Sequence, residues 1–221
     1  ASRVSAAMGV HAEIYILNEA VPFTFTTNWQ VLLLSVLVGL LGILMCWLFH
    51  EAEHFASHKL PNPWVRIALG GALIAAMTLL VGDHRYNGVG MDMALAAVAG
   101  EADWYDFAMK LLFTAVTLSA GFKGGEIVPT FCIGATFGCL FGGLVGLEPG
   151  IAAALGLVGL FCCATNSPFA SIVLSIEMFG AENIHLFALM CVICFVLSGK
   201  TGLYASQIIQ FSKATAVGKD K

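Results

Sequence analysis

The acidic and basic residues of this 221-residue chain are confined to a few places, and six long stretches between them contain no Asp, Glu, Lys or Arg. These stretches are 31–49, 67–82, 111–122, 127–147, 149–176 and 183–199. At a rise of about 1.5 Å per residue the first stretch reaches about 28 Å, close to the roughly 30 Å hydrocarbon thickness of a bilayer. So many uncharged stretches in one small chain predict repeated membrane passes.

The composition excludes the main soluble classes. Only 11% of the residues are charged, 59% are hydrophobic, and the mean hydropathy is +0.88. A soluble domain could not cover its surface with so few charges. The net charge is −4 and no run of Lys or Arg occurs, which argues against nucleic acid as a partner. The lipid bilayer is therefore the expected surrounding.

Four of the apolar segments, at 107–120, 151–163, 168–180 and 184–198, are too short to cross a bilayer, and Gly or Pro lies near their boundaries. A helix that stops inside hydrocarbon must be buried in protein or line a watery cavity, as in transporters with broken helices. We therefore expect an all-α, multi-pass membrane protein with short, broken and tilted helices. Tilted or interfacial helices without any transport pathway are the open alternative.

The sequence predicts one membrane domain at 1–212 and a short basic tail at 213–221. Lys59 and Arg66 flank the turn at 61–63, whereas the stretch 82–106 is mainly acidic. Because basic loops stay cytoplasmic, we expect this turn and the C-terminus in the cytoplasm, with the protein in the plasma (inner) membrane. No signal peptide is visible at Ala1, so we expect the chain to start internally.

All seven cysteines lie in apolar segments, where thiols behave as small hydrophobic groups. Cys191 and Cys194 have the spacing of a redox or metal motif, but no second pair or base accompanies them. We expect packing, no disulfide framework, no metal and no cofactor.

Glycines recur every four residues within the apolar stretch 127–147, which places them on one helical face. Small residues at this spacing let helix backbones approach closely in lipid. The expected packing residues are Gly134, Gly138, Gly142 and Gly146.

The segment 119–129 ends one apolar stretch and begins the next with a glycine-rich turn between them. Pro129 suits the first turn of the helix that follows. The N–H groups at such a helix start lack partners and lie at the positive end of the helix dipole, so they favour an anion. A glycine hinge followed by an ordinary span is the alternative.

Three blocks, in order, resemble the CLC family of chloride channels and anion/proton antiporters. They are 117–138, with its Gly-Gly pair and Pro129; 164–180, with Pro168, Glu177 and Gly180; and Gly-Leu-Tyr-Ala at 202–205. The resemblance covers roughly 30–210 and corresponds to the C-terminal half of the family's transport domain. The motif with the gating Glu is absent, so either this sequence is a fragment of the transporter or the other half is a separate chain. The resemblance implies the N-terminal half of the transporter as a partner, in a homodimer.

The resemblance implies that the main-chain N–H groups of Glu126 and Ile127 and the hydroxyl of Tyr204 bind the anion. In having an acid at position 126, the sequence resembles the fluoride/proton antiporter branch of the family. This makes Glu126 the candidate for proton coupling. The alternatives are that the Glu126 carboxylate only stabilises the start of the helix, or that Lys123 neutralises it. The implied function is transport of fluoride, or chloride, in exchange for protons, without enzymatic activity.

A rival reading rests on His50-Glu51-Ala-Glu-His54, which matches the H-E-x-x-H helix of zinc metalloproteases. Catalytic zinc needs a third protein ligand, and His58 lies about 12 Å further along a helix from His50. We expect a solvated polar helix end at the membrane surface. A proton-accepting or metal-touching surface site and an intramembrane protease are the two alternatives.

Overall fold

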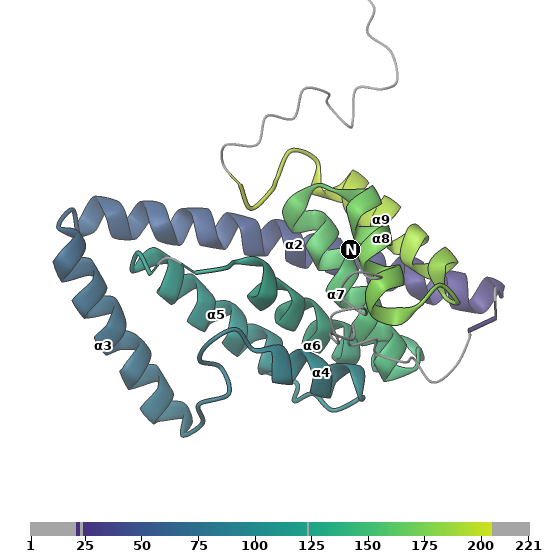
Figure 1. Ribbon diagram of the computed structural model, residues 1–221, viewed down its shortest axis with the longest axis horizontal. Helices are drawn as coiled ribbons and strands as arrows, with labels where there is room; N and C mark the ends of the chain where they lie inside the picture. The colour runs from purple at the N-terminus through teal and green to yellow at the C-terminus, as the bar shows by residue number, and fades with distance from the viewer. Residues whose placement is uncertain (1–20, 23, 123, 205–221) are drawn as a thin grey trace, which may run out of the picture.

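The computed structural model describes residues 21–204 except 23 and 123; the basic tail predicted at 213–221 lies outside the described residues. The described part contains eight α-helices and no strand, which confirms the all-α class (Figure 1). The helices are α2 (Phe25–Lys59), α3 (Pro63–Val81), α4 (Met91–Val98), α5 (Asp106–Ser119), α6 (Ile127–Val145), α7 (Pro149–Thr165), α8 (Pro168–Phe179) and α9 (Ile184–Ser198).

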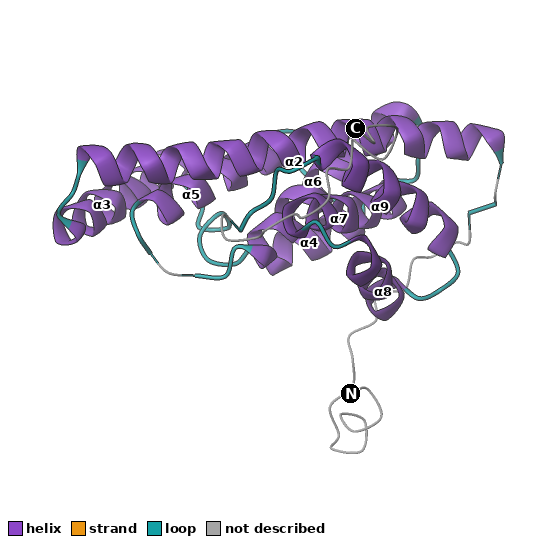
Figure 2. Cartoon of the chain, turned by 90° about the horizontal axis from the view of Figure 1, so that it is seen from above, coloured by secondary structure: helices purple, strands orange, loops and turns teal. Residues whose placement is uncertain are grey.

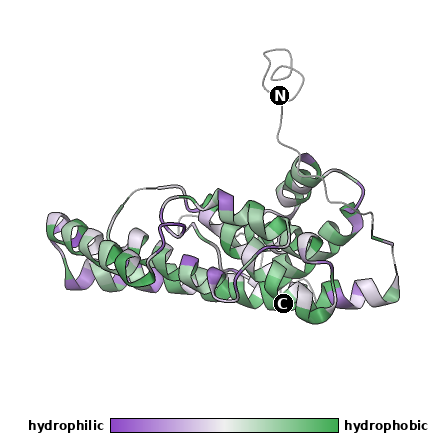
Figure 3. Cartoon of the chain, turned by 90° about the horizontal axis from the view of Figure 1, so that it is seen from below, coloured by the Kyte–Doolittle hydropathy of each residue, from purple (hydrophilic) through white to green (hydrophobic). Residues whose placement is uncertain are grey.

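Three helices, α2, α3 and α6, are long and apolar enough to cross a membrane. The expected short helices are confirmed: α5, α7, α8 and α9 have 14, 17, 12 and 15 residues. Helix α2 differs from the expected span at 31–49 because it has 35 residues and continues through the polar segment 50–59. Figure 3 shows the hydrophobic residues along the helices and the hydrophilic ones mainly at helix ends and in loops.

Local signals set the ends of the central helix α7. The carboxylate of Glu148 accepts hydrogen bonds from the N–H groups of Gly150 (3.1 Å) and Ile151 (2.8 Å), and Pro149 starts the helix. Asn166 ends the helix in the left-handed region, at φ 55°. Almost every residue of α7 is buried, so this helix forms the core of the described structure.

The longest helix, α2, runs along the molecule beside the layer formed by α5, α6 and α7 (Figures 1 and 2). After the turn at 60–62, α3 diverges from α2 and reaches the rest of the molecule through α5 (Figure 1). The C-terminal helices α8 and α9 pack on α7, and α9 also packs on α2.

Three of the four glycines expected to pack lie against α7. A Cβ at Gly134 would lie 2.5 Å from the carbonyl oxygen of Gly156, and one at Gly138 would lie 2.2 Å from that of Ala152. A Cβ at Gly142 would lie 2.0 Å from the Cβ of Ala152. The backbones of α6 and α7 therefore approach as closely as only glycine permits.

Gly146 differs from the expectation of a fourth glycine on that face. Helix α6 ends at Val145, and Gly146 follows in the left-handed region at φ 83°. The N–H of Gly146 donates to the carbonyl of Gly143, and that of Leu147 donates to the carbonyl of Gly142. This is the double hydrogen bond of a Schellman cap, so Gly146 terminates the helix instead of extending its packing face.

The cysteines are buried thiols at helix contacts. The thiol of Cys162 on α7 donates to the carbonyl of Cys191 on α9, and the thiol of Cys163 donates to the carbonyl of Cys194, both at 3.4 Å. These bonds tie α7 to α9, so the Cys191/Cys194 pair serves helix packing in this structure.

Candidate anion site

The turn between α5 and α6 is built on glycine. Gly121 adopts φ 89°, and the N–H groups of Gly121 and Phe122 donate to the carbonyls of Leu118 and Thr117, which closes α5. Gly124 and Gly125 are exposed, and a Cβ at either would meet no atom within 4 Å. The backbone of this turn is therefore open to a small ligand.

Glu126 immediately precedes the first residue of α6. It is half-buried, and its carboxylate forms no hydrogen bond that caps the helix. Its carbonyl accepts from the N–H and hydroxyl of Thr130, the latter at 2.8 Å. The N–H groups of Ile127 and Val128 belong to the first helical turn, where no intrahelical acceptor exists. A carboxylate and free N–H donors thus occupy the same helix start.

A cavity of about 430 Å³ adjoins this turn. Gly124, Gly125 and Pro129 line one part of it, and Gly88 and Thr114 line another. The cavity therefore extends from the loop before α4 to the residues that precede Glu126.

Tyr204 reaches the molecule from a different element. The N–H of Leu203 donates to the carbonyl of Ala164 at 2.8 Å, and the side-chain amide of Asn166 donates to the carbonyl of Thr201 at 2.8 Å. These bonds hold the segment 201–204 at the end of α7. Within the described residues the hydroxyl of Tyr204 forms no hydrogen bond, and none joins it to Glu126. The structure therefore leaves this phenol available without bringing it into direct contact with the α6 start.

The elements that carry Glu126 and Tyr204 share α2 as a neighbour. Cys163 precedes Ala164, whose carbonyl holds Leu203. It packs closely on α2, because a Cβ added at Gly42 would lie 2.6 Å from the Cβ of Cys163. Helix α6 also packs on α2. One stretch of α2 thus positions both candidate anion-binding elements.

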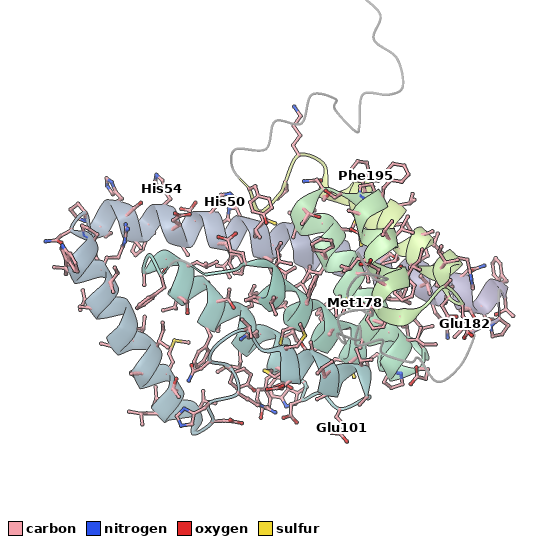
Figure 4. The ribbon with its side chains drawn as sticks, in the orientation of Figure 1. His50, His54, Glu101, Met178, Glu182 and Phe195 are labelled. Carbon is pink, nitrogen blue, oxygen red and sulfur yellow. The ribbon has the colours of Figure 1, made fainter. Side chains whose placement is uncertain are left out.

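The H-E-x-x-H residues do not form a metal centre. The Nδ1 atom of His50 is 2.7 Å from the carbonyl oxygen of Cys46, and His54 stacks on His58 with ring centroids 6.4 Å apart. Figure 4 shows His50 and His54 on the same side of α2. In the described part of the chain no three His, Cys, Asp or Glu residues are grouped to hold a metal ion. The protease alternative therefore has no support in the structure.

Sequence reasoning missed a buried charged network at the start of α5. Asp106 accepts from the guanidinium of Arg85 (2.7 Å) and from the hydroxyl of Tyr86 (2.6 Å). Burial, with the hydrogen bond to Asp106, raises the pKa of the Tyr86 phenol. Lys110 is 1% exposed, and its ammonium donates to the carbonyls of Tyr86 (3.0 Å) and Gly88 (2.7 Å).

One signal for this network was present in the sequence. Asp106 and Lys110 are four residues apart, the spacing at which opposite charges share a helix face. Lys110 lies within the segment 107–120, which is otherwise mainly apolar, so the overall hydrophobicity of the segment conceals the charge pair. In the structure this lysine holds the Gly88 carbonyl at the wall of the cavity that also borders Gly124 and Gly125.

Comparison with known proteins places this geometry in a family. Residues 1–199 match the family described as voltage gated chloride channel. The chain is 33% identical over 219 residues to a chloride/fluoride channel protein of Pseudomonas syringae pv. tomato, covering 96% of this chain and 48% of the relative. It is 26% identical over 181 residues to the H(+)/Cl(-) exchange transporter ClcA of Yersinia pestis bv. Antiqua, covering 76% and 37% of the two chains.

A solved structure has the same fold. The crystal structure of a CLC-type fluoride/proton antiporter matches with a TM-score of 0.86 and 28% identity, over 92% of this chain and 52% of that one. The chain spans about half the length, or less, of the curated relatives it matches. The family match, the shared helical fold and the order of the motifs agree: this chain is an integral membrane protein of the voltage-gated chloride channel (CLC) family.

Proposed function

We propose that this chain is the C-terminal half of the transport domain of a CLC-type antiporter that exchanges fluoride, or chloride, for protons. The observation that carries the proposal is the carboxylate of Glu126 at a helix start with free N–H donors. Two of the similar proteins are named for fluoride: the chloride/fluoride channel protein and the fluoride/proton antiporter. Both support fluoride as the transported anion.

In this proposal the N–H groups of Glu126 and Ile127 bind the anion, and the hydroxyl of Tyr204 completes its shell. An ionised carboxylate competes with the anion for the same donors, and protonation removes that competition. Glu126 thereby couples proton uptake to anion binding. The reaction is transport, without covalent chemistry.

The assembly is also part of the proposal. The similar proteins are about twice as long, so an N-terminal half is the first partner, and two copies of the resulting transport domain form the homodimer. The position of Lys59 and Arg66 beside the α2–α3 turn supports a cytoplasmic turn and a cytoplasmic C-terminus in the inner membrane.

The test reconstitutes the complete transporter in vesicles and records anion and proton movement together. In Glu126→Gln we expect fluoride movement to persist while proton movement driven by a fluoride gradient is lost. Tyr204→Phe is the comparison variant. It should keep the coupling but weaken fluoride binding about ten- to a hundredfold, since a hydrogen bond to a charged group contributes about 1.5–3 kcal/mol.

Unchanged proton-to-fluoride stoichiometry in Glu126→Gln would contradict the coupling role. Running the same vesicles with chloride decides between the anions, because faster coupled chloride movement would overturn the assignment of fluoride.

A further inference from the structure

Two contacts fix the register between α2 and α6. The amide of Gln30 donates to the carbonyl of Val145 at 2.9 Å, and the hydroxyl of Thr130 lies 3.9 Å from the sulfur of Met45. The partners are separated by the same number of residues on each helix, 45 − 30 and 145 − 130, or fifteen. The helices are therefore antiparallel and stay in step over about 22 Å.

The same register locates the start of α6 on α2. Glu126 precedes Thr130 by four residues, so it lies opposite Phe49, the last residue of the uncharged part of α2. Glu53 follows Phe49 by one turn, and it follows the buried Cys46 by seven residues, nearly two full turns. Glu53 thus continues the face of α2 that packs on the protein.

The electrostatic neighbours of Glu126 agree with this placement. Its carboxylate interacts with the charges of Glu53 and His50, and the thiol of Cys46 interacts with it from the same helix. Of the other helices that pack on α6, α5 carries Asp106 and Lys110, whose charges act on Cys132, six residues further along α6 than Glu126. Lys123 lies outside the described residues.

The side chains of Glu126, Glu53 and His50 differ in their exposure to solvent. Glu126 is half-buried beside the free N–H donors of α6, whereas Glu53 and His50 are exposed on the polar end of α2. Two neighbouring carboxylates resist simultaneous ionisation, so such a pair tends to hold one proton in common. Histidine is the side chain best suited to exchange that proton with water near neutral pH.

We propose that Glu53 is the residue through which Glu126 exchanges protons with water, with His50 beside it as the second proton acceptor. This inference rests on the proposed function. In the transfer step the O–H bond of the Glu53 carboxylic acid breaks and an O–H bond forms on the Glu126 carboxylate, directly or through a bridging water. The charge moves from Glu126 to Glu53, and no other bond changes. The H-E-x-x-H segment thereby serves proton exchange instead of metal binding.

The experiment compares Glu53→Gln with Glu51→Gln in the complete transporter reconstituted in vesicles. The two variants remove the same charge, but Glu51 is two residues from Glu53 and lies on the opposite side of the helix. We expect proton movement driven by a fluoride gradient to fall about tenfold or more in Glu53→Gln, since a positioned acid–base group contributes about 10²–10⁴-fold. Fluoride exchange measured without proton movement should be as fast in Glu53→Gln as in the unchanged protein. The Glu51→Gln variant should match the unchanged protein in both measurements.

A second readout separates proton transfer from a structural effect. His50→Gln should move the pH profile of coupled proton movement, and Glu53→Asp should restore part of the rate because it keeps the carboxyl group. Equal proton rates and pH profiles in Glu53→Gln and Glu51→Gln would overturn the inference. So would a Glu53→Asp variant as slow as Glu53→Gln. If the unchanged protein moves fluoride without protons, the proposed function itself fails, which is a distinct result.

Discussion

Helices α7 and α3 are alike in sequence and opposite in environment. Each is apolar, starts at a proline and has 17 or 19 residues. In α7 nearly every side chain is buried, whereas in α3 only Thr78 is. Leu79 and Leu80 of α3 are 82% and 87% exposed.

The difference lies in their partners. Helix α7 is enclosed by α2, α4, α6, α8 and α9, and its glycines let α6 approach at backbone distance. Among the described helices, α3 has its main contact with α5, and it approaches the chain closely where Gly70 meets Ala120, the residue after α5. In a membrane protein, exposed apolar side chains meet lipid or another protein. Burial therefore distinguishes α7, which packs inside this chain, from α3, whose apolar side chains face lipid or another protein.

The largest expected effect contrasts one leucine on each helix. Leu155 of α7 is fully buried, so Leu155→Ala should cost about 2–5 kcal/mol of unfolding free energy through lost contacts and a cavity. Leu80→Ala on α3 should stay within about 0.5 kcal/mol, as an exposed substitution does. Denaturant unfolding of the purified protein in detergent measures both. An equal loss in the two variants would break the comparison and would mean that protein covers the outer face of α3.

An intermediate effect is expected within α6. A Cβ at Gly138 would meet a backbone oxygen of α7, so Gly138→Ala should cost about 1–3 kcal/mol. Gly143 is the matched control on the same helix, because a Cβ there meets nothing within 4 Å. Gly143→Ala should be neutral or gain up to about 1 kcal/mol, since alanine favours a helix more than glycine does. Thermal unfolding of both variants checks this, and a reversed order would refute the close α6–α7 approach.

The smallest effect concerns the close approach of α3 to Ala120. A Cβ at Gly70 would lie 2.1 Å from the Cβ of Ala120, whereas one at Gly71 would lie 3.7 Å from the Phe122 ring. Gly70→Ala should cost less than about 1 kcal/mol, because α3 has few partners and can shift. Combining it with Ala120→Gly in a double-mutant cycle should recover a coupling energy of about 0.5–1 kcal/mol. A cycle without coupling, or a Gly71→Ala variant with the same cost, would show that α3 lies elsewhere.

Part of the candidate site could be predicted from local sequence. The glycines of the turn, Pro129 and the acid at 126 are neighbours in the chain, and their order alone indicates a helix start that faces an anion. The role proposed for Glu53 could not be predicted in this way, because its relation to Glu126 depends on how α2 and α6 align. The same holds for Arg85, whose pairing with Asp106 joins a loop to a later helix.

The sequence by itself determined the class of protein and the approximate limits of the short helices α5, α7, α8 and α9, although α2 continues beyond the charge-free stretch 31–49. Charge-free stretches partition into lipid, and Pro and Gly start and stop helices, through forces that act within a few residues. The tertiary structure decided which apolar helix is enclosed, that Gly146 is a cap, and that α2 and α6 pair in the register that sets Phe49 opposite the α6 start. These outcomes depend on the register between segments far apart in the chain, and hydrophobicity, which has no direction, does not specify that register.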